Sequence, residues 1–326
     1  MKKLKPACKR ELLKRIMSQI GVISVNISEK KGEIKLPVKS IQLTADGVAG
    51  DAHSGKWHRQ VSLLGAESFE KFSQITGKSF AWGEFAENIT TKGLVLNEMR
   101  PGDILRNSTI ELEVTQIGKK CHGDGCAIFR DTGACIMPKE GIFAKVIKGG
   151  SLTAGDKLEY IQKIWKTGVI TLSDRASEGV YPDLSGPEVS RSLGEYFTNS
   201  GRKSECDYRL IPDDKNLLAD SIESMIKAGC EVIVTTGGTG IGPRDYTPEV
   251  VKPLLDKEIP GIMDFIRMKY GAQKPNALLS RSIAGLAGES LVFVLPGSLK
   301  AVKEYMAEIL PMLDHLIAMK SGLDNH

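Results

Sequence analysis

Residues 235–249 contain the side chains best suited to chemistry on a phosphorylated ligand: glycines, hydroxyls, an arginine and an aspartate. Glycines let the backbone come close to a ligand and turn free N–H groups toward an anion. The hydroxyls of Thr236 and Thr239 add further donors. Arg244 can bind a phosphate through its forked guanidinium, and Asp245 can bind a metal ion. The stretch therefore predicts a site for phosphate and metal.

The flanking residues indicate where this stretch lies. The apolar, β-branched run at 230–234 predicts a buried strand. Thr247, Pro248 and Glu249 are typical of a helix start, with Thr247 as the N-cap. Ligands bind at such strand ends in open α/β sheets. A purely structural turn is the alternative, because glycine-rich turns are common and neither a Walker A loop nor a convincing dinucleotide fingerprint is present.

The rest of this half alternates between strand and helix. Buried strands are expected at 168–172, 207–211, 232–234 and 290–295, and helices at 217–228 and 300–320. This order predicts an α/β fold with a mostly parallel sheet flanked by helices. The loops at 173–187, 212–214, 235–249 and 296–300 all follow strands. We therefore expect them to meet at one edge of the sheet.

The first half has a different pattern of apolar and polar residues. Alternating runs at 21–27, 33–36, 40–43 and 109–115 predict short strands, and one helix is expected near 65–75. Many short strands indicate a β-rich barrel. The boundary between the domains falls near 161–166, which gives domains at 21–162 and 163–326. Residues 1–20 form a basic extension, interpreted as a surface-packed or frayed segment, with a membrane-surface helix as the alternative.

Composition narrows the class of protein. The chain of 326 residues is long enough for two domains, and its net charge of +4 is too small to indicate nucleic acid as a partner. No apolar run approaches the ~20 residues of a membrane helix, and no signal peptide is expected. Six cysteines are too few for a disulfide framework, so a reducing cytoplasm is the expected location.

Ordered motifs in residues 167–319 resemble those of the molybdopterin adenylyltransferase family, which includes the MogA and MoaB proteins. The motifs are Ser-Asp-Arg at 173–175, Tyr-x-Asp-x-Ser-Gly-Pro at 181–187, Pro-Asp at 212–213, Thr-Thr-Gly-Gly-Thr-Gly at 235–240, Pro-Arg-Asp-x-Thr-Pro-Glu at 243–249, Leu-Ser-Arg at 279–281 and Leu-Pro-Gly-Ser at 295–298. The resemblance implies transfer of AMP from Mg-ATP to molybdopterin, with release of pyrophosphate. Pro-Arg-Asp at 243–245 supports an active enzyme, because inactive MoaB-type members depart there.

The resemblance also implies residue roles. Asp213 and Asp245 match the family's catalytic aspartates and, as oxygen ligands, can hold Mg²⁺ on the ATP phosphates. A helix N-cap is the alternative role for Asp213, or for Asp214. Substrate binding is expected from the following residues: Ser173, Asp174, Arg175, Thr236, Gly237, Gly238, Thr239, Gly240, Arg244, Pro296, Gly297 and Ser298. Among them, the N–H groups of Gly237, Gly238 and Gly240 are expected to cradle phosphate.

Residues 21–162 resemble the MOSC domain, a module related to the C-terminal region of molybdenum cofactor sulfurases. The similarity lies at 50–64, 85–89, 118–122 and 137–143, and it implies that Cys121 carries sulfur or ligates the molybdenum of a bound cofactor. Lys119, Lys120 and His122 would favour a thiolate there. Two alternatives stay open: a structural cysteine, and zinc held by Cys121, His122, Cys126 and Cys135. His53 and His58 can reach an anionic pterin phosphate or serve as ordinary polar groups.

Several functional expectations follow from both resemblances. The substrates are ATP and molybdopterin, the metal ion is Mg²⁺, and the MOSC module handles sulfur or the mature molybdenum cofactor. The C-terminal domain is expected to form a trimer and to depend on a separate metal-insertion protein of the MoeA type. The alternative function is a non-catalytic pterin carrier or molybdenum sensor. Whether molybdenum or tungsten is finally inserted is open.

Overall fold

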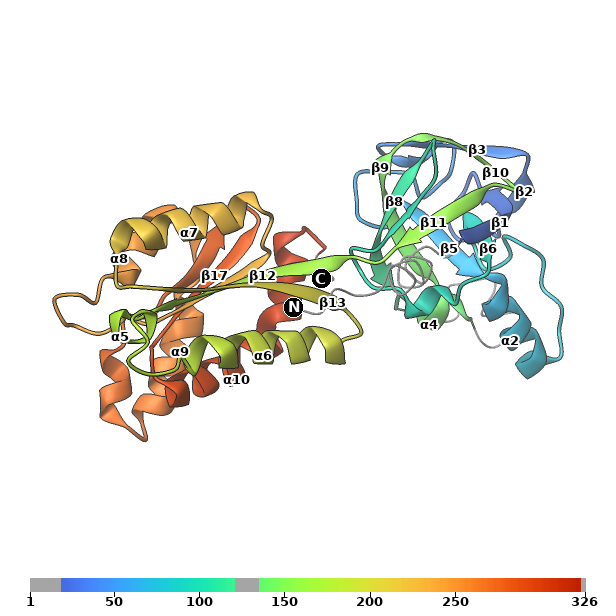
Figure 1. The fold of residues 1–326 in the computed structure, drawn as a ribbon. Helices are drawn as coiled ribbons and strands as arrows, with labels where there is room; N and C mark the ends of the chain where they lie inside the picture. Colours follow the sequence, from blue (N-terminus) through green and yellow to red (C-terminus); the bar gives the residue numbers. More distant parts are fainter. Residues whose placement is uncertain (1–18, 121–134, 324–326) are drawn as a thin grey trace, which may run out of the picture. The chain divides into compact units, whose positions relative to one another are not determined.

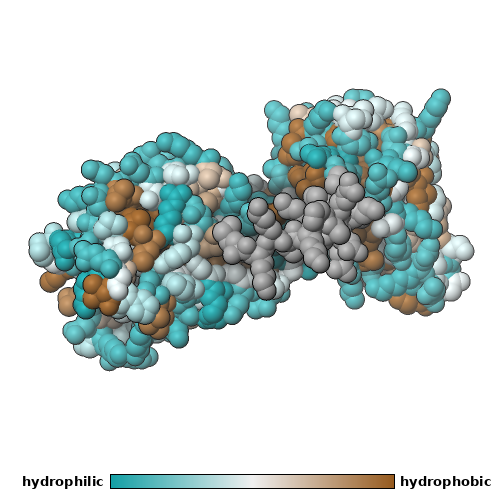
Figure 2. Space-filling view, viewed as in Figure 1, coloured by the Kyte–Doolittle hydropathy of each residue, from teal (hydrophilic) through white to brown (hydrophobic). Residues whose placement is uncertain are grey.

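The computed structural model describes residues 19–120 and 135–323, which fall into two compact units, Met1–Lys163 and Ile164–His326 (Figure 1). Each unit has its own hydrophobic core. In the described part of the chain, no helix is both long enough and apolar enough to cross a membrane. On the face seen in Figure 2, hydrophilic residues cover most of both units, and apolar residues break this cover in places.

The N-terminal unit is a closed β-barrel. Among the described residues, seven strands form a ring in which the last pairs with the first. In ring order they are β1 (Gln19–Ile27), β11 (Lys157–Ile161), β7 (Ile104–Arg106), β8 (Glu111–Ile117), β9 (Ile142–Lys148), β5 (Val61–Gly65) and β6 (Ile89–Lys92). Strand β2 (Leu36–Val38) extends the sheet from β1, and β10 (Gly150–Thr153), β3 (Ser40–Thr44) and β4 (Gly47–Val48) form a separate small sheet. Closure leaves no exposed edge around the ring.

The alternating runs at 21–27, 40–43 and 109–115 correspond to β1, β3 and β8. The strand expected at 33–36 is wrong, because the described strand is β2, which begins at Leu36. Lys35, the polar residue that completed the alternation, is fully buried and ion-paired with Asp51. The helix expected near 65–75 is α2 (Ala66–Thr76), and Phe69 and Phe72 on its inner side join an aromatic cluster. The described part of this unit also contains two short helices, η1 (Leu96–Glu98) and α4 (Met137–Glu140).

The C-terminal unit contains a mixed six-stranded sheet. Its order is β13 (Lys203–Ile211), β12 (Ile164–Leu172), β14 (Val232–Thr236), β17 (Ser290–Leu295), β16 (Ala284–Ala287) and β15 (Lys257–Glu258). The first four strands are parallel, as the alternation predicted. Strand β16 pairs antiparallel with β17, and β15 pairs antiparallel with β16. Neither of these two strands was predicted. They are short, and β16 joins β17 through a tight turn at Gly288, so neither has the length of a typical buried strand.

Helices cover both faces of this sheet (Figure 1). On one face lie α6 (Ser185–Asn199), α9 (Pro260–Gly271) and α10 (Leu299–Lys320), which share a core with the strands. On the other face lie α7 (Lys215–Lys227) and α8 (Thr247–Val251), followed by η3 (Lys252–Leu254). Burial on both faces explains the nearly continuous apolar runs of the central strands.

The register of the parallel strands aligns their carboxyl ends. Thr171 in β12 pairs with Thr236 in β14, which in turn pairs with Leu295 in β17. Leu172 pairs with Ile211 at the end of β13. The loops after these four strands therefore begin at the same edge of the sheet, as the sequence predicted.

Candidate functional site

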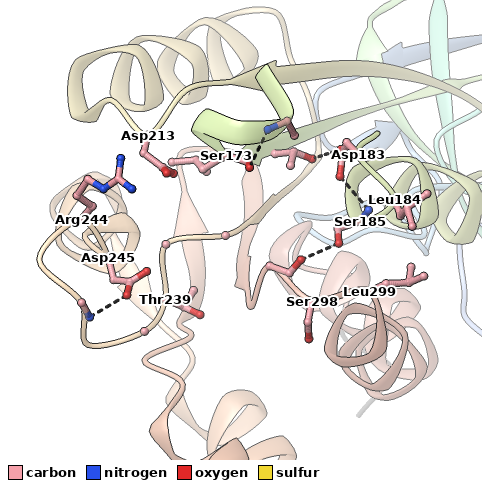
Figure 3. Close-up of a pocket in the computed structure, with 18 of the residues that line it drawn as sticks. Ser173, Asp183, Leu184, Ser185, Asp213, Thr239, Arg244, Asp245, Ser298 and Leu299 are labelled. Atoms are coloured by element: carbon pink, nitrogen blue, oxygen red, sulfur yellow. Dashed lines mark hydrogen bonds between the residues drawn. The ribbon is translucent and has the colours of Figure 1, made fainter. Parts of the chain in front are cut away.

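A cavity of about 840 Å³ lies at this edge (Figure 3). Its walls come from the loops after β12, β13, β14 and β17 and from the start of α6. The lining residues are Thr171, Leu172, Ser173, Ala176, Tyr181, Pro182, Asp183, Leu184, Ser185, Asp213, Gly237, Gly238, Thr239, Gly240, Gly242, Pro243, Arg244, Asp245, Gly297, Ser298 and Leu299. A volume of this order suits a ligand of drug or nucleotide size.

Two glycines give the loop after β14 its shape. Gly237 and Gly238 have φ values of +110° and +63°, which other residues rarely adopt. A Cβ on Gly237 would lie 2.4 Å from the carbonyl oxygen of Leu172, and one on Gly238 would lie 2.3 Å from the hydroxyl of Thr247. The Thr247 hydroxyl donates instead to the Gly237 carbonyl at 2.9 Å. The glycines therefore permit the packing of this loop against its neighbours.

Three expectations about this loop need correction. Thr247 is not the N-cap of α8, because Tyr246 occupies that position and the Thr247 side chain binds the loop. Thr236 does not offer a donor to a ligand, since it is fully buried and its hydroxyl donates to the Pro296 carbonyl at 2.8 Å. The Gly237 N–H is also occupied, because it donates to the Leu295 carbonyl at 3.0 Å. For Gly238 and Gly240 the phosphate-binding role stays a prediction.

The two adjacent aspartates after β13 have different environments. Asp214 is the N-cap of α7, and its carboxylate accepts from the N–H groups of Asn216 and Leu217, both at 2.8 Å. Asp213 lines the cavity instead. Burial raises the pKa of Asp213, and the negative charges of Asp174 and Asp245 act in the same direction. The N-cap alternative thus applies to Asp214.

Charged groups meet at the mouth of the cavity. Arg244 forms an ion pair with Asp174, and the Asp174 carboxylate also accepts from the backbone N–H of Asp213 at 2.8 Å. Asp245 accepts from the N–H of Gly242 at 2.8 Å. Asp174 therefore joins the loops after β12, β13 and β14 without itself lining the cavity.

The remaining predicted residues separate into two groups. Ser173 and Ser298 line the cavity and are also the N-caps of α5 (Asp174–Ser177) and α10. Gly297 lies beside Gly237 and accepts from the hydroxyl of Ser185 at 2.7 Å. Arg175 and Pro296 do not line the cavity; the Arg175 guanidinium lies 5.0 Å from the centre of the Tyr181 ring.

Asp183 is a cavity residue that the list of expected site residues omitted. Its carboxylate accepts from the hydroxyls of Thr171 and Tyr208, both at 2.7 Å, and from the N–H of Ser185 at 2.9 Å. Burial raises the pKa of Tyr208 to about 12, and the hydrogen bond to Asp183 adds to this effect. Asp183 is the aspartate of the Tyr-x-Asp-x-Ser-Gly-Pro motif at 181–187, so this motif could have identified it as a site residue.

The acid groups fit a magnesium ion that arrives with a nucleotide. Among the residues the structure describes, no cluster of three or more His, Cys, Asp and Glu side chains can hold a metal ion alone. Asp213 and Asp245 do line one cavity, and their charges act on each other. Mg²⁺ is commonly bound by one or two carboxylates together with substrate phosphates. The donor set therefore suits Mg²⁺ on a nucleotide better than a resident metal.

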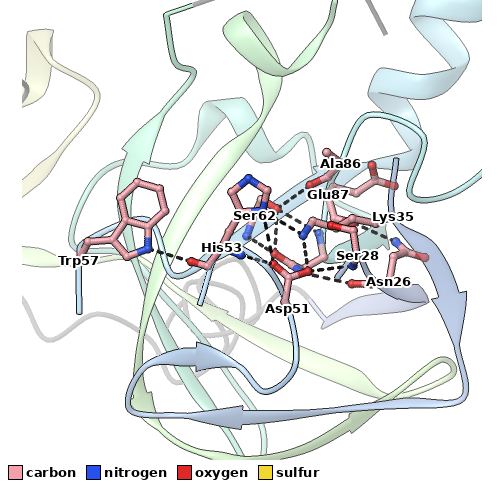
Figure 4. Close-up of polar contacts among 10 residues, drawn as sticks. Asn26, Ser28, Lys35, Asp51, His53, Trp57, Ser62, Ala86 and Glu87 are labelled. Atoms are coloured by element: carbon pink, nitrogen blue, oxygen red, sulfur yellow. Dashed lines mark hydrogen bonds and ion pairs between the residues drawn. The ribbon is translucent and has the colours of Figure 1, made fainter. Parts of the chain in front are cut away.

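The N-terminal unit has a smaller pocket of about 100 Å³. Figure 4 draws the polar contacts around several of its lining residues, among them His53, Ser62 and Ala86. Its lining combines aromatic and cationic side chains: His53, Trp57, Arg59, Ser62, Ala86, Asn88, Lys119, Met137 and Phe143. The Arg59 guanidinium lies 4.8 Å from the centre of the Trp57 ring, and its buried Nε has no hydrogen-bond partner among the described residues. Ala86 has a φ of +63°, a conformation that is uncommon for alanine and occurs most often at sites of function.

A buried ionic network supports one side of this pocket. Lys35 forms an ion pair with Asp51, and Nδ1 of His53 lies 3.5 Å from both the Lys35 Nζ and the Asp51 carboxylate. Burial alone would raise the pKa of Asp51, but hydrogen bonds from His53 and Lys35 hold it well below its usual range. Asp51 also binds the side-chain amide of Asn88 at 3.1 Å. The network fixes His53 at the pocket wall.

The other predicted residues of this unit have different outcomes. His58 does not line the pocket; its Nε2 lies 3.0 Å from the side-chain oxygen of Gln116. Cys121, His122 and Cys126 lie outside the described residues. Cys135 is half-buried beside the aromatic cluster of α2. The zinc alternative is therefore still open.

Comparison with known proteins identifies both halves. A family model described as a probable molybdopterin binding domain matches residues 168–315, and the MOSC domain model matches residues 50–159. The molybdopterin adenylyltransferase of Helicobacter pylori strain J99 is 38% identical over 156 residues, which are 48% of this chain and 87% of the relative. The enzyme of that name from Pyrococcus furiosus is 38% identical over 162 residues, which are 48% of this chain and 90% of the relative. A solved molybdopterin biosynthesis protein from Mycobacterium abscessus is 34% identical, with 49% of this chain and 98% of that chain covered and a TM-score of 0.44.

The two enzymes that are 38% identical place the C-terminal half among transferases of molybdenum cofactor biosynthesis. The chain belongs to the molybdopterin adenylyltransferase family. In this chain, the MogA/MoaB-type domain follows a MOSC domain.

Proposed function

We propose that the C-terminal unit transfers AMP from Mg-ATP to the terminal phosphate of molybdopterin. A phosphate oxygen of molybdopterin bonds to the α-phosphorus of ATP, the bond from that phosphorus to the β-bridging oxygen breaks, and pyrophosphate leaves. The products are adenylylated molybdopterin and pyrophosphate. The observation that carries the proposal is one cavity that joins the glycine turn with Asp213, Arg244 and Asp245.

The chemistry requires that two polyanions be held together, so positioning and charge compensation dominate. In the proposal, the N–H groups of Gly238 and Gly240 bind phosphate, and Arg244 leaves Asp174 to bind a second phosphate group. Asp213 and Asp245 would hold Mg²⁺, which when bound supplies positive charge to the nucleotide phosphates. Ser173 and Ser298, at the N-termini of α5 and α10, would bind molybdopterin or its phosphate.

The experiment measures pyrophosphate release from ATP by the purified full chain. We expect release only when molybdopterin and Mg²⁺ are both present, with one adenylylated molybdopterin for each pyrophosphate. Omission of molybdopterin is the control. The alternative, a non-catalytic pterin carrier or molybdenum sensor, predicts binding of molybdopterin with no pyrophosphate above the control. Intact acids at Asp213 and Asp245 favour the enzyme.

For the N-terminal unit we propose a role in handling sulfur or mature molybdenum cofactor through Cys121. The support is the pocket lined by His53, Arg59 and Lys119, because the cationic groups of Arg59 and Lys119 suit an anionic ligand. Lys119 is close to Cys121 in sequence and would favour its thiolate.

A native-state alkylation experiment, combined with zinc analysis, tests this role. Cys121 should react fastest among the cysteines of the N-terminal unit near neutral pH. Cys230 is an internal control, because burial raises the pKa of its thiol. Cys121→Ser should abolish retention of mature cofactor without changing pyrophosphate release. Stoichiometric zinc with an unreactive Cys121 would establish the zinc alternative instead.

The proposal extends to assembly and location. Phe265 and Met268 on α9 are 53% and 70% exposed, and exposed apolar side chains of this size suit an interface between subunits. We propose a trimer formed through the C-terminal unit, in the cytoplasm, with a separate MoeA-type protein inserting the metal. Light scattering of the full chain tests the trimer, and a monomeric mass at micromolar concentration would contradict it.

A further inference from the structure

Arg281 lies opposite the glycine-rich loop and forms several hydrogen bonds with it. It follows η4 (Pro275–Leu279) and precedes β16, and its side chain is 35% exposed. It does not line the cavity. Its contacts therefore concern the loop and not a ligand.

The guanidinium of Arg281 binds both ends of the segment 240–245. Its Nε donates to the Gly240 carbonyl at 2.7 Å, and one terminal nitrogen donates to the Asp245 carbonyl. The other terminal nitrogen forms an ion pair with Glu249 in α8. The backbone N–H of Arg281 donates to the Thr239 carbonyl at 3.0 Å, just before the segment. One side chain thus connects the beginning of the loop, its end and the helix that follows.

Besides Arg281, one ion pair among the described residues, between Arg244 and Asp174, connects the segment to the rest of the unit. Residues 240–245 belong to no helix or strand, and Ile241 in the middle is 79% exposed. The hydrogen bonds between Gly242 and Asp245 close a local turn but do not join it to the rest of the unit. Because Arg281 holds both carbonyls that flank this turn, the position of the Asp245 carboxylate depends on it.

We propose that Arg281 is a positioning residue that holds Asp245 at the cavity in the orientation needed for adenylyl transfer. This inference rests on the proposed function, in which Asp245 is a catalytic acid. The planar fork of arginine donates in several fixed directions, whereas lysine carries the same charge as a single point. The inference therefore concerns directed hydrogen bonds to carbonyls and not the charge of residue 281.

Four variants separate this role from charge pairing. Arg281→Gln removes the fork and the charge, and Arg281→Lys keeps the charge alone. Glu249→Gln removes the ion pair and leaves both carbonyl contacts in place. Arg267→Gln is the matched control, because Arg267 donates to the carbonyls of Ser282 and Ser280, at 2.8 and 3.4 Å, and pairs with Asp264, and these partners all lie outside the segment 240–245.

Two measurements are made on the full chain. In the substrate-free protein, hydrogen–deuterium exchange of the peptide that covers 240–245 should accelerate in both Arg281 variants and stay unchanged in Glu249→Gln and Arg267→Gln. In the pyrophosphate assay, both Arg281 variants should lower kcat about 10- to 100-fold with little change in the KM for molybdopterin, because misplacement of a reacting group by about 1 Å has an effect of this size. Thermal melting confirms that each variant is folded.

The following results would overturn the inference. Unchanged exchange and kcat in Arg281→Gln would remove the positioning role. Full activity in Arg281→Lys, or an equal loss in Glu249→Gln, would show that charge pairing suffices. A raised KM with kcat unchanged would make Arg281 a substrate contact. If Asp245→Asn keeps full turnover, the proposed role of Asp245 fails. The exchange measurement still tests separately whether Arg281 holds the segment 240–245.

Discussion

The carboxylate of Asp245 faces the cavity and accepts a hydrogen bond from Gly242 within its own turn. Asp213 stands on the adjacent loop, where burial raises the pKa of its carboxyl and the negative charges of Asp174 and Asp245 act in the same direction. A site that gathers acids of this kind is prepared for a cation, because the cation relieves their repulsion.

Asp245→Asn should therefore lower the rate of adenylylation by orders of magnitude while leaving the fold and molybdopterin binding largely intact. The amide keeps the shape of the side chain but loses the charge that would ligate Mg²⁺. Steady-state rates with saturating Mg-ATP, together with molybdopterin binding by titration, check this. Near wild-type turnover under these conditions would refute the assignment.

In the N-terminal unit, Glu87 provides a prediction for pH dependence. Burial raises the pKa of Glu87 from an ordinary value of 4.5 to about 7, and its buried Oε2 has no partner among the described residues. A carboxyl whose folded pKa exceeds its unfolded value has no cost at low pH, where both states are protonated. Its cost grows as pH rises from about 4.5 through 7, because the folded state then has to bury a charge.

Glu87→Gln should remove this loss. Wild type should lose stability of the N-terminal unit on the order of 3 kcal/mol between pH 4.5 and pH 8, since one pKa unit corresponds to about 1.4 kcal/mol. Denaturant unfolding of both proteins at a series of pH values measures the difference. The variant should have a flatter profile, and parallel profiles would show that Glu87 does not ionise in this range.

Helix α7 illustrates how one element separates structural from chemical roles. Its N-terminus is capped by Asp214, while Asp213, one residue earlier, lies outside the helix and faces the cavity. The amides that Asp214 satisfies would otherwise be exposed donors at the helix start.

Asp214→Ala should reduce the stability of the C-terminal unit by about 1 kcal/mol, the usual cost of losing an N-cap, with little effect on kcat. Asp213→Asn should show the reverse, with a low kcat and unchanged or increased stability because it removes a charge with a raised pKa. Chemical denaturation and pyrophosphate assays on both variants test the pair. Loss of activity in Asp214→Ala at temperatures where it is fully folded would contradict the division.

For the complete chain, the important feature is that each unit has its own closed core and its own pocket. The described contacts divide at Lys163 and Ile164, and the cavity of the C-terminal unit is lined entirely by residues after Ile164. Adenylyl transfer should then need nothing from the barrel.

A fragment of residues 163–326 should fold alone and keep the kcat of the full chain. Circular dichroism and the pyrophosphate assay test this, with the full chain as the control. An insoluble or inactive fragment whose activity returns on addition of the N-terminal half would show that the two units depend on each other.

Local patterns in the sequence predicted much of this protein. Apolar runs and alternation located the four parallel strands and, in the N-terminal unit, β1, β3 and β8, because burial on one or both faces sets the order of apolar and polar residues along a strand. The order of the loops predicted the edge at which the site forms, because the carboxyl ends of parallel strands meet. The glycines, Asp213 and Asp245 were recognised from residue type and motif.

Other features depend on contacts between residues far apart in the chain. Thr236 and Thr239 look equivalent in the sequence, yet only Thr239 lines the cavity, because the register of β14 against β17 places the Thr236 hydroxyl on the Pro296 carbonyl. Lys35 lies within the run at 33–36 that predicted a strand, yet its side chain is buried against Asp51. Arg281 reaches a loop more than thirty residues earlier. Tertiary packing decides which hydrogen-bond partner a side chain has, because the partner is distant in the sequence. The local pattern of residues therefore does not predict that partner.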